Sequence, residues 1–457
     1  MKKINFIFFF LLLFHLSSKG FEKIIFRHTN NISALEKNNF ISEKDSGNQY
    51  FNANYLRYSD HIYKSNIRTV ELYEKSWELS PPLIQLNSEQ RLKLSFDDLD
   101  GDMKSYSYTL VHCDANWQPS DLHPMDYLNG FTQDQIIDYA YSYNTLQHYT
   151  HYNLIFPNEN MQITKSGNYL LEVYTDNDPD SLVFTKRFMV FEQKVTVNAQ
   201  VTKPVDANDM YYKQAVKFSI DYTGYNIADP YGSLTVVITQ NGRWDNAIST
   251  LKPLYIKENF LDYNYDQDNE FTGDNEFRHF DLQSLRYKTD RISVINLDSN
   301  KHNQVFLTDD ETRNFKRYFS DADINGNYLI KTHDGTNSEL ESEYVNVHFF
   351  LPYDAPITDG NLYVFGALSA WQCTDDCKMN YDYKAHGYTL SMYLKQGYYN
   401  YEYVFLKDGS TAADATLIEG MHYETENDYT IYVYNRPLGS TYDQLIAVKK
   451  INSVKLK

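Results

Sequence analysis

The sequence predicts an all-β protein, a string of immunoglobulin-like or early-set antiparallel β-sandwich domains. Apolar and polar residues alternate with a period of two in many short runs, as in strands that bury one face. Turn-forming residues separate these runs, and no helical pattern lies between them, which favours sandwiches over mixed folds. The chain has 42 Tyr, 27 Phe and 4 Trp among 457 residues. So many aromatic side chains exclude a disordered chain.

The first 20 residues predict a secretory signal peptide. Lys2 and Lys3 form a basic start, an apolar run covers 4–16, and small residues precede Gly20. The apolar run is shorter than the roughly 20 residues that a membrane-spanning helix needs. We therefore expect cleavage, export and no transmembrane segment. The next stretch, 21–60, is polar and lacks periodicity, so we expect a flexible leader.

Residues 61–192 predict a first β-sandwich. Asp100-Gly101 and Ser166-Gly167 are turn signals between its strands. The alternating runs predict strands at 92–96, 106–110, 152–156, 169–173 and 188–190.

Residues 193–335 predict a second sandwich, with strands at 195–201, 216–222 and 234–238. Asn241-Gly242 then provides a strong hairpin signal, since both residues tolerate a positive φ. The stretch 257–291 is acidic and aromatic without a clear period. We expect it to be a long connection between strands.

Residues 340–457 predict a third, C-terminal sandwich after a polar seam. No repeat of 20 to 50 residues is visible, so the chain is a string of domains rather than a solenoid. The strands expected here cover 345–349, 363–365, 388–394, 399–405 and 431–433.

The charge and the cysteines exclude several classes of function. Lys and Arg number 42 against 61 Asp and Glu, a formal net charge of −19, which disfavours nucleic acid and anionic lipid as partners. Three cysteines cannot build a disulfide scaffold. Cys373 and Cys377 are candidates for a local disulfide in an oxidising compartment, or for two free thiols, while Cys113 is expected to be a buried core thiol.

No motif predicts a catalytic residue, a metal site or a cofactor. The segment 321–327 imitates the start of a calcium loop, but its twelfth position is Thr332, which has no carboxylate, so a turn is favoured. His148 and His151 are three apart, which places them on opposite faces of a strand and makes them poor co-ligands. The sequence contains no Gly-x-Ser-x-Gly, no His-Glu-x-x-His and no phosphate-binding glycine loop. We expect no enzymatic activity.

Several motifs together resemble a known family. They include Leu92-Lys93-Leu94-Ser95-Phe96-Asp97-Asp98-Leu99-Asp100-Gly101-Asp102, His112-Cys113-Asp114-Ala115-Asn116-Trp117, Tyr149-Thr150-His151-Tyr152 and Ser166-Gly167-Asn168-Tyr169. They strongly resemble the plug proteins of the type IX secretion system, and the likeness extends over nearly all of the chain after the signal peptide. The motif residues that we single out are Asp97, Asp98, Asp100, His112, Asp114 and Trp117.

This resemblance implies a location and a partner. A plug protein is a non-enzymatic, all-β protein of the periplasm, at the periplasmic face of the outer membrane. It would contact the outer-membrane translocon barrel and seal its periplasmic opening while no substrate is in transit.

The C-terminal unit has a second, weaker resemblance. Residues 364–371 and 397–405 are similar to early-set sandwiches that bind glycogen or starch. The likeness implies Trp371, with Tyr399, Tyr401 and Tyr403, as candidate contacts for a glycan or a partner. Glu402 stands where a sugar-contacting Lys is expected, so we expect the fold without a bound glycan. An exported carbohydrate-binding protein is the alternative function.

Overall fold

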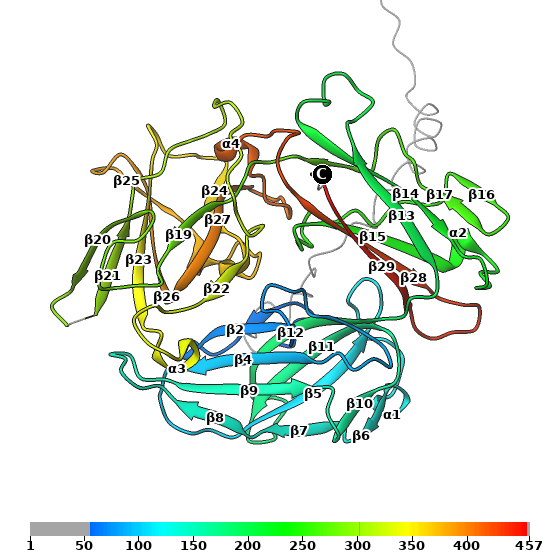
Figure 1. The fold of residues 1–457 in the computed structure, drawn as a ribbon, viewed down its shortest axis with the longest axis horizontal. Coiled ribbons are helices and arrows are strands. Elements are labelled where there is room, and N and C mark those ends of the chain that lie inside the picture. The colour runs from blue at the N-terminus through cyan, green and yellow to red at the C-terminus, as the bar shows by residue number, and fades with distance from the viewer. Residues whose placement is uncertain (1–54, 301, 455–457) are drawn as a thin grey trace, which may run out of the picture. The chain divides into compact units, whose positions relative to one another are not determined.

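The computed structural model describes residues 55–300 and 302–454 (Figure 1). The predicted signal peptide and most of the predicted leader lie outside these residues. Strands dominate, and each α-helix is a single turn of four residues. The predicted all-β sandwich class is confirmed. No helix among the described residues is long and apolar enough to cross a membrane.

The first sandwich consists of two sheets and a short ribbon. One sheet has the order β1 (His61–Ile62), β12 (Leu182–Phe191), β11 (Gly167–Thr175), β5 (Tyr106–Cys113) and β7 (Gln133–Ile136), with β3 (Leu83–Gln85) parallel to β12. The other has the order β2 (Ile67–Glu74), β4 (Leu92–Asp98), β9 (Thr150–Phe156) and β8 (Asp138–Tyr141). Helix α1 (Pro124–Tyr127) leads into β6 (Leu128–Gly130), which pairs with β10 (Met161–Ile163).

The second sandwich also has two sheets. One contains β13 (Thr196–Thr202), β14 (Lys213–Asp221), β17 (Phe260–Asp262) and β16 (Tyr255–Lys257), with β18 (Glu270–Thr272) paired to β14. Helix α2 (Pro230–Ser233) leads into the other, whose order is β15 (Leu234–Gln240), β28 (Asp428–Asn435) and β29 (Gln444–Asn452).

The third sandwich also has two sheets. One sheet has the order β20 (Ile292–Leu297), β21 (Asn303–Leu307), β23 (Tyr344–Pro352), β26 (Gly387–Lys395) and β25 (Asn380–Asp382). In the other, β27 (Gly397–Lys407) pairs with β19 (Arg278–Asp281), β22 (Tyr328–Ile330) and β24 (Gly360–Phe365). Helices α3 (Ser338–Glu341) and α4 (Thr416–Glu419) lie before β23 and after β27.

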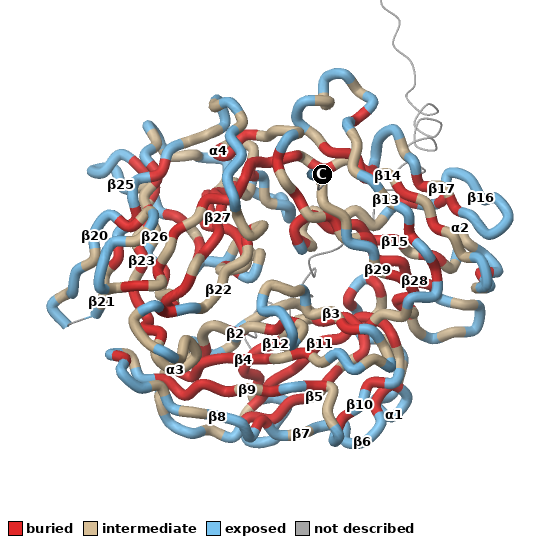
Figure 2. The backbone as a smooth tube through the Cα atoms, in the orientation of Figure 1, coloured by how far each residue is buried: buried red, intermediate tan, exposed pale blue. Residues whose placement is uncertain are grey.

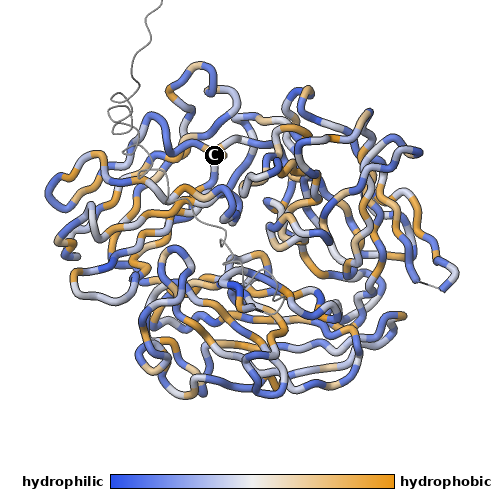
Figure 3. The backbone as a smooth tube through the Cα atoms, turned by 180° about the vertical axis from the view of Figure 1, so that it is seen from behind, coloured by the Kyte–Doolittle hydropathy of each residue, from blue (hydrophilic) through white to orange (hydrophobic). Residues whose placement is uncertain are grey.

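Each sandwich encloses its own cluster of buried apolar side chains. Figure 2 shows the buried residues concentrated along the strands, and Figure 3 shows the same strands rich in hydrophobic residues from behind. Burying one face of each strand is the main stabilising contribution, on the order of 25 cal/mol per Å² of apolar surface.

Strand pairing crosses the predicted boundary between 193–335 and 340–457. Strand β15 pairs over its whole length with β28, so a C-terminal hairpin completes the second sandwich. Strands β19 to β22, from the predicted second unit, belong to sheets of the third. Alternation identifies a strand and its buried face but contains no information about its partner. A division in chain order therefore does not describe these sheets.

The stretch 257–291, predicted to be a long connection, contains three strands in two sandwiches. The prediction is wrong because these strands are short and their apolar and polar residues alternate poorly. Phe271 and Phe280 are buried in different cores. The Asn241-Gly242 turn does form with positive φ at both residues, but the returning chain makes only an isolated bridge between Ile238 and Ile248.

Candidate functional site

Asp97 is the first family-motif residue that departs from simple alternation. In β4, Leu94 and Phe96 are buried in the first core, yet Asp97 on the opposite face is also fully buried. The third sandwich covers that face. The Asp97 carboxylate accepts hydrogen bonds from His151 Nδ1 at 2.6 Å, Lys395 Nζ at 2.6 Å and Tyr344 Oη at 2.7 Å.

Lys395 and Tyr344 come from β26 and β23, so Asp97 joins the first sandwich to the third. The Lys395 side chain is 1% exposed and also donates to the Glu339 carbonyl at 2.8 Å. Its ammonium lies 4.2 Å from the centre of the Tyr149 ring. Burial alone would raise the pKa of Asp97, but Lys395 and His151 hold it below its ordinary value.

Polar contacts around α3 extend this first–third junction. Tyr149 Oη donates to the carbonyls of Glu339 at 2.9 Å and Ser342 at 3.1 Å. The Glu343 carboxylate accepts from the backbone N–H groups of Leu146 and, at 3.0 Å, Gln147. The junction therefore pairs buried polar groups of one sandwich with those of the other, which favours one arrangement of their strands; His151 Nε2, 3.6 Å from Glu339 Oε2, has no hydrogen-bond partner.

Glu71 on β2 is a second acid near Lys395. Burial raises the pKa of Glu71 to about 8. The nearby charges of Asp97 and Glu78 add to this rise, and those of Lys395 and Lys93 oppose it. The raised pKa keeps the Glu71 carboxyl protonated at neutral pH, whereas the lowered pKa of Asp97 keeps that carboxylate ionised.

We expect Glu71→Gln to change how stability depends on pH. In the wild type the folded state keeps the Glu71 proton at pH values where the unfolded chain has already released it. The free energy of unfolding therefore falls as pH rises toward 8. The slope is at most about 1.4 kcal/mol per pH unit. The glutamine amide does not titrate. In denaturant unfolding, the stability of the variant relative to the wild type should therefore increase between pH 5 and pH 8. Parallel profiles for the two proteins would contradict this role of Glu71.

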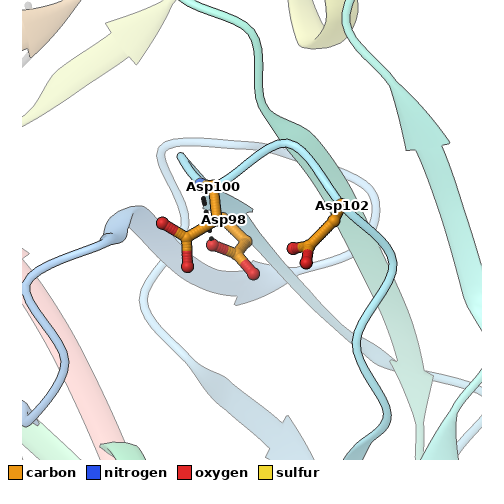
Figure 4. Close-up of side chains that lie close together, drawn as sticks. All are labelled: Asp98, Asp100 and Asp102. Atoms are coloured by element: carbon orange, nitrogen blue, oxygen red, sulfur yellow. Dashed lines mark hydrogen bonds between the residues drawn. The ribbon is translucent and has the colours of Figure 1, made fainter.

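Asp98 and Asp100 form a turn within the first sandwich. Asp98 is fully buried and accepts from Asn66 Nδ2 at 2.6 Å, Lys104 Nζ at 2.7 Å and Tyr106 Oη at 2.9 Å. Asp98, Asp100 and Asp102 each place a carboxylate oxygen within 4.8 Å of the others (Figure 4). Lys104 pairs with all three acids, so a cation is already present among them. The cluster is a charge-satisfied turn.

His112, Asp114 and Trp117 lie where the first sandwich meets the second. His112 is buried between Ser120 Oγ at 2.9 Å and the Ser166 carbonyl at 3.1 Å. Burial lowers its pKa to about 4, so the ring is neutral. Its edge meets the ring of Tyr442, from the turn between β28 and β29.

Asp114 shapes the turn that places Trp117 in this first–second junction. Its Oδ1 accepts the backbone N–H groups of Asn116 at 2.8 Å and Gln118 at 2.9 Å. Trp117 then has a φ of 63° and is 1% exposed. Its ring meets Trp244 edge-on at 5.2 Å, while the Arg187 guanidinium lies over it at 4.5 Å.

Backbone and side-chain bonds complete the first–second junction. The Asp443 carboxylate accepts from the Ala115 N–H at 2.9 Å, and Tyr434 Oη donates to Asn168 Oδ1 at 2.8 Å. The Glu192 N–H donates to the carbonyl of Leu445 at 2.8 Å. The C-terminal hairpin is therefore fixed to the first sandwich by the motif that contains Trp117.

The six motif residues do not converge on one chemical centre. Asp97 lies in the first–third junction, and His112, Asp114 and Trp117 lie in the first–second junction. Asp98 and Asp100 stabilise a turn beside Asp97. A catalytic site would bring a nucleophile, a base and an open pocket together. Four of these residues instead connect domains, and Asp98 and Asp100 stabilise a turn within the first sandwich.

The predicted contact residues of the third sandwich are mostly in its interior. Tyr399, Tyr401 and Tyr403 are buried, so the prediction that they contact a glycan or partner is wrong. Strand β27 has partners along its length and is covered on both faces, unlike the half-exposed strand that alternation suggested. The hydroxyls of Tyr401 and Tyr403 both donate to Asp310 Oδ2 at 2.7 Å.

Trp371 packs against the 321–327 turn. Its ring meets Phe277 and Phe365 edge-on, at 6.0 and 5.5 Å between centroids. A Cβ at Gly326 would lie 2.3 Å from the indole, so only glycine fits beneath it. Trp371 also lines a pocket of about 310 Å³ together with Asp245 and Cys373. These contacts are those of a packing residue.

Glu402 has a structural partner in place of a sugar. It is buried 3.4 Å from Arg243 Nη1, and Arg243 also pairs with Asp245 at 2.8 Å. Arg243 comes from the second sandwich, so this pair forms a second–third junction. The acid at this position lies beside a buried arginine whose nearer partner is Asp245, and burial raises the pKa of Glu402 above its ordinary value while Arg243 opposes that shift.

Cys373 and Cys377 are both free thiols in the structure, which therefore lacks the candidate disulfide. Cys377 is buried in a turn and accepts a contact from Thr374 Oγ1 at 3.7 Å, while Cys373 borders the pocket. Cys113 is buried, as expected.

Sequence reasoning missed the buried basic residues of the junctions and of the third sandwich. Lys395 ends an alternating strand, where a lysine ordinarily faces solvent. Arg243 follows a turn signal, and Arg278 lies in the stretch taken for a connection. The only feature of the sequence that could have indicated these residues is a single Lys or Arg beside a strand terminus.

The fold and these junctions define a class: an all-β chain of sandwiches whose motif residues fasten one sandwich to the next. Residues 67–192 match the family described as the type 9 secretion system plug protein 1st domain. The chain belongs to the type IX secretion plug family. Proteins of that family are non-catalytic components of the secretion machinery.

A solved structure resembles the whole described fold. It is the crystal structure of a hypothetical protein from Parabacteroides merdae, with 34% sequence identity and a TM-score of 0.84. The match covers 87% of this chain and 100% of the other. Among curated proteins, none matches.

Proposed function

We propose that this protein is the periplasmic plug of the type IX secretion translocon and closes the periplasmic opening of the outer-membrane barrel when no substrate is in transit. The observation that carries the proposal is the match of residues 67–192 to the plug protein 1st domain. The proposed location is the periplasmic face of the outer membrane, after export by the signal peptide. The proposed partner is the translocon barrel, and no enzymatic step is assigned.

The junctions support this proposal physically. A plug must resist deformation as a body, because a chain of freely hinged domains would leak. Asp97 and Arg243 join two sandwiches by buried ion pairs, and Trp117 does so by packing its ring against Trp244. Interfaces with satisfied buried polar groups and aromatic anchors are less free to move than small polar ones.

The alternative, an exported carbohydrate-binding protein, loses its structural support. Its candidate aromatic strand is buried, and Trp371 packs on Gly326 and Phe277. Sugar-binding aromatic side chains must present an open face to the ligand.

Deleting the protein in its host tests the sealing function. We expect the outer membrane to become permeable to large dyes and to antibiotics that it normally excludes. Expression of the wild-type chain from a plasmid should restore the barrier, which controls for effects of the deletion on neighbouring genes. Unchanged permeability, together with absence of the translocon from the purified protein, would overturn the proposal.

A further inference from the structure

One continuous segment of the first sandwich has an unusual charge pattern. The 60 residues from 105 to 164 contain neither Lys nor Arg, although the chain has 42 of them in 457 residues. Over the same stretch there are six acids, at Asp114, Asp121, Asp126, Asp134, Asp138 and Glu159. The charged Asp and Glu side chains that this segment offers to a partner are therefore all negative, with no Lys or Arg of the segment to offset them.

Two sheet edges meet within this stretch. Strand β7 is last in its sheet and pairs with β5, and β8 is last in the other sheet and pairs with β9. A single residue, Ile137, connects the two strands. Among the described residues, β7 and β8 have no strand on their other side. Figure 2 shows this part of the first sandwich as largely exposed.

The segment 131–146, here called the edge segment, exposes large apolar side chains. Ile137 is 80% exposed, Phe131 60% and Tyr141 53%. Tyr143 and Leu146 are exposed as well. Several large apolar side chains exposed along one segment are typical of interaction sites in folded proteins.

The edge segment also lacks the usual protection of a sheet edge. Natural edge strands are commonly blocked by lysine or proline, and the edge segment contains neither. Strand β16, the edge of the second sandwich, offers a comparison within the chain. It also exposes a tyrosine and an isoleucine, Tyr255 and Ile256, but it ends in Lys257.

We propose that the edge segment is the surface through which this protein docks on the translocon barrel, by pairing with an extended strand of the barrel rim that carries apolar and basic side chains. The free edges supply backbone groups for strand addition, and the exposed apolar residues fill pockets of the added strand. The acids at Asp134 and Asp138 select a basic partner. This inference rests on the proposed plug function.

The test compares two matched double variants of the full-length protein. Ile137→Lys with Tyr141→Lys adds positive charge to the edge segment, and Ile256→Lys with Tyr255→Lys does the same on β16. Each tagged protein is purified from solubilised membranes, and the co-purified barrel is quantified after circular dichroism has shown equal folded content. We expect the first pair to reduce the barrel by about tenfold or more, as loss of interface anchors does, and the second pair to leave it unchanged.

A photo-crosslinker at position 141 provides a second readout that needs no lysine. We expect it to join the barrel at a peptide rich in Lys or Arg, and we expect the same crosslinker at position 255 to give no product. Retention of the barrel by both variants, with crosslinks from 255 alone, would overturn the docking surface and leave the plug function standing. Absence of the barrel from the wild-type preparation would overturn both.

Discussion

Replacing Lys395 by methionine is expected to destabilise the protein by about 3–5 kcal/mol, because it leaves the Asp97 carboxylate buried without its counter-ion. Lys395 Nζ lies 2.6 Å from Asp97 Oδ2, and both side chains are almost completely buried. Methionine fills a similar volume, so the expected loss is electrostatic rather than a cavity. Denaturant unfolding followed by tryptophan fluorescence measures the change.

Lys93→Met is the matched control, because Lys93 also bridges to the third sandwich but is partly exposed. It pairs with Glu339 at 2.5 Å, and the side chains are 20% and 46% exposed. Solvent screening limits such a pair to about 1 kcal/mol or less. If Lys395→Met cost no more than Lys93→Met, the buried ion pair would not be what holds this junction.

The pH dependence of the same pair provides an independent check. The pKa of Asp97 is lowered in the folded state, so its contribution is present above the ordinary aspartate value and is lost as pH falls below about 4. The difference between wild type and Lys395→Met should therefore shrink in acid. The same denaturation experiment at low pH measures it.

Replacing Arg278 by methionine is expected to cost about 3–5 kcal/mol by breaking a buried network in the third sandwich. Arg278 forms a two-bond contact with Glu419, with Nε to Oε1 and Nη2 to Oε2 both at 2.9 Å, and its Nη1 lies 2.9 Å from Asp310. Glu419 would retain Arg313, but Asp310 would keep only Arg291 and the two tyrosine hydroxyls.

Arg286→Met controls for loss of an arginine in the same sandwich. Arg286 is 74% exposed and lies 3.6 Å from Asp334, so its removal should change stability by about 0.5 kcal/mol or less. Thermal unfolding of both variants and the wild type tests the comparison. Equal midpoints for Arg278→Met and Arg286→Met would show that the network does not stabilise the fold.

Much of the strand content could be predicted from the sequence, because a half-buried strand needs one apolar face. Leu92, Leu94 and Phe96 predicted β4, and Val345 and Val347 predicted β23. Strands covered on both faces could not be recognised in this way. Tyr399, Tyr401 and Tyr403 alternate like a half-exposed strand, and only the covering of the intervening residues reveals the interior position of β27.

Strand partners and the junctions could not be predicted from the sequence for a related reason. Pairing of β28 with β15 joins residues about 200 positions apart, a contact that no local pattern specifies. The family motif did direct attention to Asp97 and Trp117, but its residue types gave no indication that they act between sandwiches. Their partners, Lys395 and Trp244, are distant in the chain and lie outside the motif.

Affinity purification of the tagged, full-length protein from solubilised membranes tests the central claim most directly. The proposed function predicts that the outer-membrane barrel of the type IX system co-purifies as the principal partner, and that a mock purification from untagged cells lacks it. Recovery of the tagged protein without the barrel, under conditions in which the barrel is shown to be intact in the extract, would contradict the account.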